Sequence, residues 1–188
     1  MNKIIAFSGS NSKESINQKL VKYASGFVTE ASVSVVNLRD YELPLYGIDL
    51  ENEEGIPENA LKLKKLFDEN DGFIIALPEH NTSITAFFKN TIDWLSRIHM
   101  SFFEHKPIVL LATSPGPGGG RNALAHGEKI LSGYMSGKVI GTQFVPQFHQ
   151  TTSVNANGEI IVIDEEIAEN IEQLVKKLEG SMKTVVSA

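Results

Sequence analysis

Residues 3–20, KIIAFSGSNSKESINQKL, join an apolar segment to an amphipathic one through a loop of small polar residues. The apolar run at 3–8 is short and uninterrupted, which is typical of a strand buried on both faces of a parallel sheet. From Ser15 to Thr29 the apolar residues recur at spacings of three and four, which predicts a helix. This stretch therefore predicts a strand, a polar loop and a helix, the repeating unit of an α/β fold.

The same alternation continues along the chain. Four further apolar or β-branched runs predict strands at 32–38, 72–78, 107–114 and 138–145. The remaining helices are predicted at 57–70, 85–98, 121–135 and 165–180, with Gly180 closing the last one. The Asn-Gly turn signal in NANGE, 155–159, predicts a small hairpin after the fifth strand. Strands that alternate with helices require crossover connections, so we expect one parallel sheet with helices on both faces.

Composition limits the class of protein. The 188 residues are 41% hydrophobic and 21% charged, without repeats or a linker, so we expect a single domain over 1–188. A net charge of −6 with no basic cluster argues against nucleic acid or membrane partners. The absence of cysteine excludes disulfides and thiolate chemistry, and the five histidines show no metal-ligand spacing. No apolar run is long enough for a signal peptide or a membrane span, so we expect a cytoplasmic protein.

Ligands of a parallel α/β sheet bind at the carboxyl ends of its strands, which directs attention to three loops. The loop after the first strand precedes a helix N-terminus, where unpaired N–H groups and the helix dipole favour an anion. Gly9 permits a tight turn there, and Lys13 adds positive charge. The small polar side chains of this loop and of the first helical turn are Ser10, Ser12, Ser15 and Asn17. A phosphate nest and an ordinary helix cap both explain these residues.

The loops after the third and fourth strands are PEHNTS, 78–83, and SPGPGGGR, 114–121. The first of these offers polar side chains and exposed amides just ahead of a helix. The second lacks Cβ atoms at four positions, so a flat ligand can approach the bare backbone. One loop suited to phosphate and two suited to a planar polar ring indicate a mononucleotide, and flavin mononucleotide (FMN) meets both demands. A hydrolase is excluded because no G-x-S-x-G motif is present.

The helix predicted at 85–98 combines core and surface positions. Its expected core stripe is Ile84, Phe88, Ile92 and Leu95. Trp94 and Phe87 fall outside this stripe and indicate packing or a subunit contact. Asp93 and Arg97 are four residues apart, a spacing that favours an ion pair on a helix.

Three segments together resemble the NADPH-dependent FMN reductase family of the flavodoxin-like superfamily. They are GSNSKESIN at 9–17, PEHNTSITAFFKNTIDWLSR at 78–97 and SPGPGGGRNAL at 114–124. The second is the most specific, because the family motif reads P-E-Y-N-x-S-x-P followed by L-K-N-x-I-D-W-x-S-R. The chain departs from the family pattern at Ser12, His80 and Thr85, where the family has arginine, tyrosine and proline.

The resemblance implies a doubly wound five-stranded sheet in the order 2-1-3-4-5 that holds FMN noncovalently, in a homodimer or homotetramer. It implies an oxidoreductase that transfers hydride from NAD(P)H through FMN to a flavin, quinone or similar small acceptor. We expect no catalytic side chain, because the flavin carries the reaction. A flavodoxin-type electron carrier, which has no nicotinamide site of its own, is the alternative.

The candidate cofactor-binding residues lie in all three loops. Those at the first loop, with Ser10, Ser15 and Asn17 implied at the phosphate, are Ser8, Gly9, Ser10, Ser12, Lys13, Ser15, Ile16 and Asn17. Those implied along the isoalloxazine and ribityl groups are Pro78, Glu79, His80, Asn81, Thr82 and Ser83. Those on the other part of the ring are Ser114, Pro115, Gly116, Gly118 and Gly119.

Overall fold

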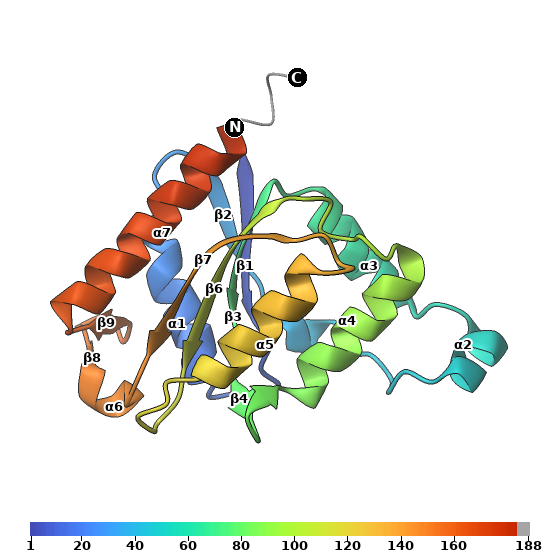
Figure 1. Ribbon diagram of the computed structural model, residues 1–188, viewed down its shortest axis with the longest axis horizontal. Coiled ribbons are helices and arrows are strands. Elements are labelled where there is room, and N and C mark those ends of the chain that lie inside the picture. The colour runs from blue at the N-terminus through green and yellow to red at the C-terminus, as the bar shows by residue number, and fades with distance from the viewer. Residues whose placement is uncertain (184–188) are drawn as a thin grey trace.

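A central parallel sheet organises the protein, whose computed structural model describes residues 1–183 (Figure 1). Its five strands are hydrogen-bonded in the order β2-β1-β3-β6-β7. They are β1 (Lys3–Ser8), β2 (Ser32–Val35), β3 (Gly72–Ala76), β6 (Pro107–Thr113) and β7 (Lys138–Val145). All four pairings are parallel. The expected doubly wound sheet and its strand order are therefore confirmed.

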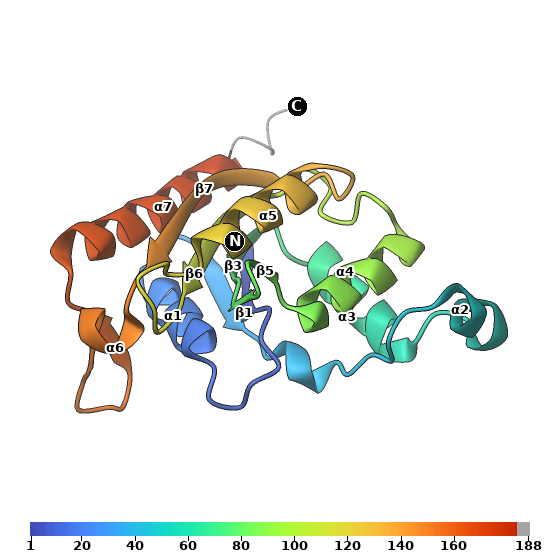
Figure 2. The same ribbon diagram turned by 60° about the horizontal axis from the view of Figure 1, so that its bottom comes forward.

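Helices cover both faces of this sheet (Figures 1 and 2). One face is covered by α1 (Ile16–Ser25) and α7 (Glu165–Lys183), and the other by α3 (Glu58–Asp68), α4 (Ala86–Ile98) and α5 (Arg121–Ser132). Side chains alternate across a strand, so Ile4 and Ala6 of β1 pack with α1 and α7 while Ile5 and Phe7 pack with the other helices. The central strands β1, β3 and β6 are thus buried between two separate apolar layers, as their uninterrupted hydrophobic sequences predict.

Smaller elements complete the described fold. They are a 3₁₀ helix (Leu38–Asp40), α2 (Ile48–Glu54), α6 (Phe148–Thr151), the antiparallel pair β4 (Glu79–His80) and β5 (Ser83–Ile84), and the antiparallel pair β8 (Thr152–Val154) and β9 (Ile160–Val162). The β8–β9 pair is the hairpin predicted at NANGE. None of the helices within residues 1–183 combines the length and the apolar character needed to span a bilayer.

Several predicted boundaries are wrong. The first helix ends at Ser25 instead of 29, the helix predicted at 121–135 ends at Ser132, and the strand predicted at 72–78 ends at Ala76. The second strand ends at Val35 instead of 38, because Asn37 caps the short 3₁₀ helix that begins at Leu38. Gly180 does not close the last helix, which continues to Lys183. Leu178 and Met182 are buried against the sheet, and their burial favours the continued helix over a glycine stop.

The helix at 85–98 has the expected core stripe, since Ile84, Phe88, Ile92 and Leu95 are all buried. Trp94 is also fully buried, and its indole N–H donates to the carbonyl of Pro44 at 2.8 Å. The expected pair of Asp93 with Arg97 does not form. Arg97 instead bonds Glu51 of α2 at 2.9 Å, and Asp93 bonds Lys89 at 2.5 Å.

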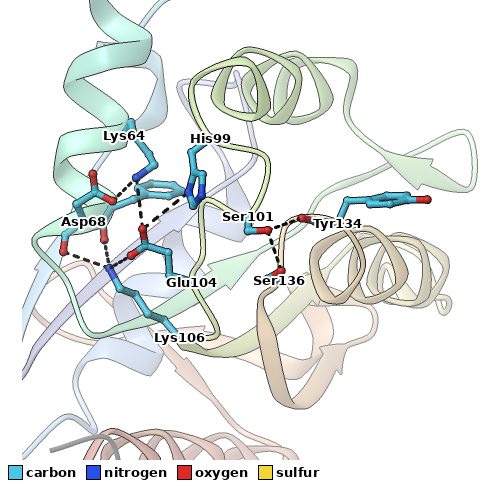
Figure 3. A network of polar contacts seen from close by, with 9 residues as sticks. Lys64, Asp68, His99, Ser101, Glu104, Lys106, Tyr134 and Ser136 are labelled. Carbon is cyan, nitrogen blue, oxygen red and sulfur yellow. Dashed lines mark hydrogen bonds and ion pairs between the residues drawn. The ribbon is translucent and has the colours of Figure 1, made fainter.

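A polar network lies at the amino end of the sheet, just before β6 (Figure 3). Lys106 donates to the backbone oxygens of Phe67 and Asp68 at 3.0 and 3.1 Å. Glu104 lies 3.7 Å from the ammonium of Lys106 and 4.0 Å from that of Lys64, which also pairs with the Asp68 carboxylate. The network ties α3 to the loop before β6 at the edge opposite the strands' carboxyl ends, so its role is structural.

Candidate functional site

The carboxyl ends of β1, β3 and β6 enclose a cleft of about 200 Å³. Ten predicted site residues line it, namely Ser10, Ser12, Ser15, Ile16, Asn17, Pro78, Glu79, His80, Ser114 and Pro115. The other predicted residues lie outside its lining, namely Ser8, Gly9, Lys13, Asn81, Thr82, Ser83, Gly116, Gly118 and Gly119. Glu14 and Thr113 line the cleft and were missed, although each adjoins a predicted position. The fold thus brings all three loops to one place.

The serines of the first loop accept backbone N–H groups through their hydroxyl oxygens. Ser10 accepts the backbone N–H of Ser12 at 3.1 Å, and Ser12 accepts that of Glu14 at 3.2 Å. Ser15 is the N-cap of α1 and accepts the N–H of Gln18 at 3.1 Å. A hydroxyl that accepts one N–H keeps its own hydrogen for donation. Capping and anion binding are therefore compatible, and the donor chemistry of this loop fits a phosphate at the start of α1.

Asn17 joins the first loop to the end of β6. Its Nδ2 donates to the carbonyl of Thr113 at 2.9 Å, and its Oδ1 accepts the N–H of Thr113 at 3.0 Å. The side chain is buried, with 3% of its surface exposed. Asn17 therefore fixes the relative position of two walls of the cleft, a contribution that is distinct from its predicted contact with phosphate.

Ser8 and Thr85 border the same loop. The Ser8 hydroxyl is buried and has no hydrogen-bond partner within residues 1–183, a situation that folded proteins usually avoid. A group bound at the end of β1 would supply a partner. Thr85 Oγ1 donates to the carbonyl of Gly9 at 2.6 Å and accepts the N–H of Phe88 at 3.0 Å. Threonine, where the family has proline, thus caps α4 and holds the first loop against it.

Gly9 is needed for close packing. A Cβ atom at this position would lie 2.9 Å from the Phe88 side chain, which is buried in the core. Lys13 is exposed and is not among the residues that line the cleft. Its proposed contribution of charge remains a prediction.

The β4–β5 hairpin forms a second wall of the cleft. His80 pairs with Ser83 across a two-residue turn, and the turn residues Asn81 and Thr82 have φ of 49° and 65°. Both values are left-handed, as the tight turns of hairpins require. Such conformations cost free energy in residues other than glycine, so tertiary contacts must hold the hairpin in place.

Glu79 supplies one such contact. Its carboxylate accepts the backbone N–H groups of Asn122 and Ala123 at 2.9 and 3.2 Å, and the side-chain amide of Asn122 at 3.0 Å. The N-cap of α5 is Gly120, which has no side chain to serve this purpose. Glu79 therefore caps α5 from another loop and also benefits from the positive end of its dipole.

The glycines of the third loop have two different roles. Gly119 and Gly120 have φ of 61° and 84°, and a Cβ would approach Phe144 to 2.6 Å and Ala112 to 2.7 Å respectively. The turn itself therefore requires glycine at these two positions. Nothing lies within 4 Å of a Cβ on Gly118, so the predicted bare backbone is available there.

A larger cavity, of about 530 Å³, lies between α1, β2 and the β8–β9 hairpin. It is lined by Tyr23, Phe27 and Ile161 among others, and none of the three loops contributes to it. Greater volume does not make it the candidate site, because it touches the end of the edge strand β2 only at Val35, the loops after β1, β3 and β6 do not reach it, and it lacks the serine-rich helix start.

Comparison with known proteins gives the same assignment as the motifs. A family model described as NADPH-dependent FMN reductase matches residues 2–150. A 2-hydroxy-1,4-benzoquinone reductase of Burkholderia sp. is 30% identical over 164 residues, which cover 86% of this chain and 87% of that protein. The quinone reductase of Escherichia coli (strain K12) is 37% identical over 90 residues, so the match spans only about half of each chain, 48%.

Solved structures resemble the whole fold. The flavoenzyme FerB, an NAD(P)H:(acceptor) oxidoreductase from Paracoccus denitrificans, superposes with a TM-score of 0.75 at 25% identity. The superposition covers 98% of both chains. The strand order and the motif-bearing loops agree with the family match over residues 2–150, so this chain belongs to the NADPH-dependent FMN reductase family.

Proposed function

We propose that the protein is an FMN-dependent NAD(P)H oxidoreductase that reduces a quinone or a similar small acceptor. The observation that carries this proposal is the meeting of the serine-rich start of α1 with the β4–β5 hairpin in one cleft. An anion site beside a hairpin edge matches a ligand that has a phosphate at one end and a polar ring at the other. The names of the related reductases support the same activity.

The residues have separate tasks in this proposal. Ser10, Ser12 and Ser15 hold the phosphate through their hydroxyl groups and the N-terminus of α1. The hairpin and the loop at 114–119 hold the ring. When bound at these residues, FMN would supply the redox chemistry between NAD(P)H and the acceptor. The protein orients these groups, and its acidic surface leaves phosphate binding to local donors.

The test begins with the absorption spectrum of the purified protein and a titration with FMN. We expect a yellow protein or stoichiometric uptake of FMN, followed by loss of flavin absorbance when NADPH or NADH is added anaerobically. A protein that binds FMN but is not reduced by either nucleotide would favour the flavodoxin-type carrier. A protein that binds no FMN would contradict both functions.

A pair of variants locates the phosphate. Ser10→Ala with Ser12→Ala removes two hydroxyl donors of the cleft and leaves the Ser15 cap in place. Ser34→Ala on the exposed edge strand β2 is the matched control. We expect FMN affinity to fall about tenfold or more in the double variant, the effect of losing hydrogen bonds to a charged group, and to be unchanged in the control.

We further propose that the protein is a cytoplasmic homodimer or homotetramer. Leu45, Ile48 and Leu61 are 81%, 54% and 50% exposed, and they lie on or beside α2 and α3, with α2 at the far edge of the molecule (Figure 2). Burial of such apolar side chains favours subunit association. Sedimentation equilibrium should give a dimer or tetramer mass, whereas a monomer at micromolar concentration would contradict this proposal.

A further inference from the structure

The β4–β5 hairpin is attached to α5 at two points one helical turn apart. Glu79 in β4 bonds the first turn of α5 at Asn122. Ser83 in β5 bonds His126, and the distance from Ser83 Oγ to His126 Nδ1 is 2.7 Å. Asn122 and His126 are four residues apart, so both lie on the face of α5 that meets the hairpin. Hydrogen bonds thus connect α5 to both strands of the hairpin.

The backbone also comes close to the hairpin along this helix. At Gly127, next to His126, a Cβ atom would lie 2.2 Å from Leu77 and 3.7 Å from Ile84. Glycine here lets α5 approach the residues at either end of the hairpin. The contact between Ser83 and His126 is therefore supported by close packing of the two elements.

The Ser83–His126 bond can run in two directions. When the imidazole is neutral and Nδ1 is the acceptor, the Ser83 hydroxyl donates its hydrogen to the ring. When the imidazole is protonated, Nδ1 carries a hydrogen and donates it to Ser83 Oγ. The bond survives protonation, but the Ser83 hydrogen becomes free to donate elsewhere. Histidine is the side chain whose ordinary titration lies in the range where this exchange would operate.

We propose that His126 is a positioning residue for the flavin, acting through Ser83, and that its protonation strengthens FMN binding. This inference rests on the proposed function, in which the hairpin that carries Ser83 holds the ring of the flavin. Ser83 lies outside the lining of the cleft, directly opposite His80, which lines it. A protonated His126 both releases a hydroxyl donor toward the cofactor and places a positive charge behind the hairpin. Each effect favours an anionic, acceptor-rich ligand on a protein whose net charge is −6.

Few other titratable groups face this pair. On the hairpin they are Glu79, which is bound to α5, and His80, which is opposite Ser83. On α5 the other charged residues are Arg121, Glu128 and Lys129. Besides the hairpin, the strands that pack against α5 are β6, which has no titratable side chain, and β7, which has Lys138 alone, at its amino end. His80 is therefore the group that must be separated from His126 in an experiment.

The experiment measures the dissociation constant of FMN for the full chain by flavin fluorescence, from about pH 5.5 to pH 8. His126→Asn keeps a hydrogen-bonding atom near the position of Nδ1 but does not titrate. His80→Gln removes the other histidine of the hairpin. Ionisation of the FMN phosphate affects every variant alike. The ratio of a variant's dissociation constant to that of the wild type therefore reports only the effect of the substituted histidine on FMN binding.

We expect this ratio for His126→Asn to rise about two- to tenfold as pH falls, the range of one added hydrogen bond. His80 lines the cleft, so His80→Gln can change the affinity itself, but its ratio to wild type should stay constant with pH. Ser83→Ala should show no further change when combined with His126→Asn. At pH 8 His126→Asn should bind FMN close to wild type, whereas His126→Ala should bind more weakly because the hairpin loses one of its two attachments to α5.

Parallel pH profiles for wild type and His126→Asn would overturn the inference while leaving the proposed function intact, because FMN would still bind. A pH effect that disappears in His80→Gln would also overturn it and assign the effect to the other histidine. Loss of FMN binding by the wild type itself would remove the proposed function and the inference together. Urea unfolding at pH 8 shows whether each variant is folded when its affinity is compared.

Discussion

Asn17 and Thr113 are 96 positions apart, yet they form a closed pair of hydrogen bonds at 2.9 and 3.0 Å, with an amide side chain taking the place of a neighbouring strand. The pair joins the first turn of α1 to the last residue of β6, where two loops of the candidate site begin. The geometry of the cleft thus depends on a buried side chain whose polar atoms are already engaged.

We predict that Asn17→Ala lowers the free energy of unfolding by about 2–3 kcal/mol, because it leaves a buried donor and a buried acceptor unpaired. Asn17→Asp keeps the acceptor but places a carboxylate oxygen against the Thr113 carbonyl, so it should be at least as destabilising. Urea unfolding measures both values. Wild-type stability in Asn17→Asp would contradict the structural role.

Gly127 tests the packing of α5 against the hairpin. We predict that Gly127→Ala destabilises the protein by about 1–3 kcal/mol, because the added methyl overlaps the fully buried Leu77 side chain. Gly180→Ala is the matched control, since nothing lies within 4 Å of its Cβ and it lies inside α7. There alanine should stabilise by about 0.5–1 kcal/mol through helix propensity. Equal shifts in both thermal midpoints would show that packing at Gly127 is unimportant.

Glu179 holds the loop that follows α1. Its Oε1 accepts the backbone N–H groups of Thr29, Glu30 and Ala31 at 3.0, 2.6 and 3.0 Å, and the residue is only 3% exposed. We predict that Glu179→Gln costs about 2 kcal/mol, because a neutral amide oxygen accepts more weakly than a carboxylate. Chemical denaturation measures the loss, with Glu172→Gln on the same helix as the control. An equal loss of unfolding free energy in both variants would show that the buried Glu179 carboxylate contributes no more than an exposed one.

The pair of Lys22 and Glu159 should give a pH-dependent contribution to stability. Lys22 bonds Glu159 at 2.9 Å and, with a smaller contribution from Asn155, lowers the pKa of that carboxyl. The folded pKa is then below the unfolded one, so the pair stabilises above about pH 4.3 and loses its effect as pH falls through the folded value.

We therefore predict that wild type is slightly more stable than Lys22→Met at pH 7, and that the difference disappears in acid. The effect is small because both side chains are exposed, and added salt should reduce it. Urea unfolding at several pH values measures it. A difference that grows in acid would contradict this sign.

The sequence by itself determined the architecture of this protein. An uninterrupted apolar run such as 72–76 indicates a strand that is buried on both faces. Because such strands alternate with amphipathic helices such as 121–132, the connections are crossovers and the sheet is parallel. The direction of each strand then fixes which loops share an edge. This is why the meeting of the three loops was predictable from residues that are far apart in the chain.

Tertiary structure alone decided the partners of several polar side chains. Local spacing favoured Arg97 with Asp93, but α2 brings Glu51 to Arg97 instead. The sequence predicted Glu79 and Ser83 as ligand contacts. In the structure both side chains also bond α5, Glu79 at Asn122 and Ser83 at His126. Hydrophobic periodicity reports burial, which is a property of a segment and its own neighbours. A hydrogen bond between two segments forms only when donor and acceptor are placed to within a few tenths of an ångström. This placement is set only when the helices pack on the sheet.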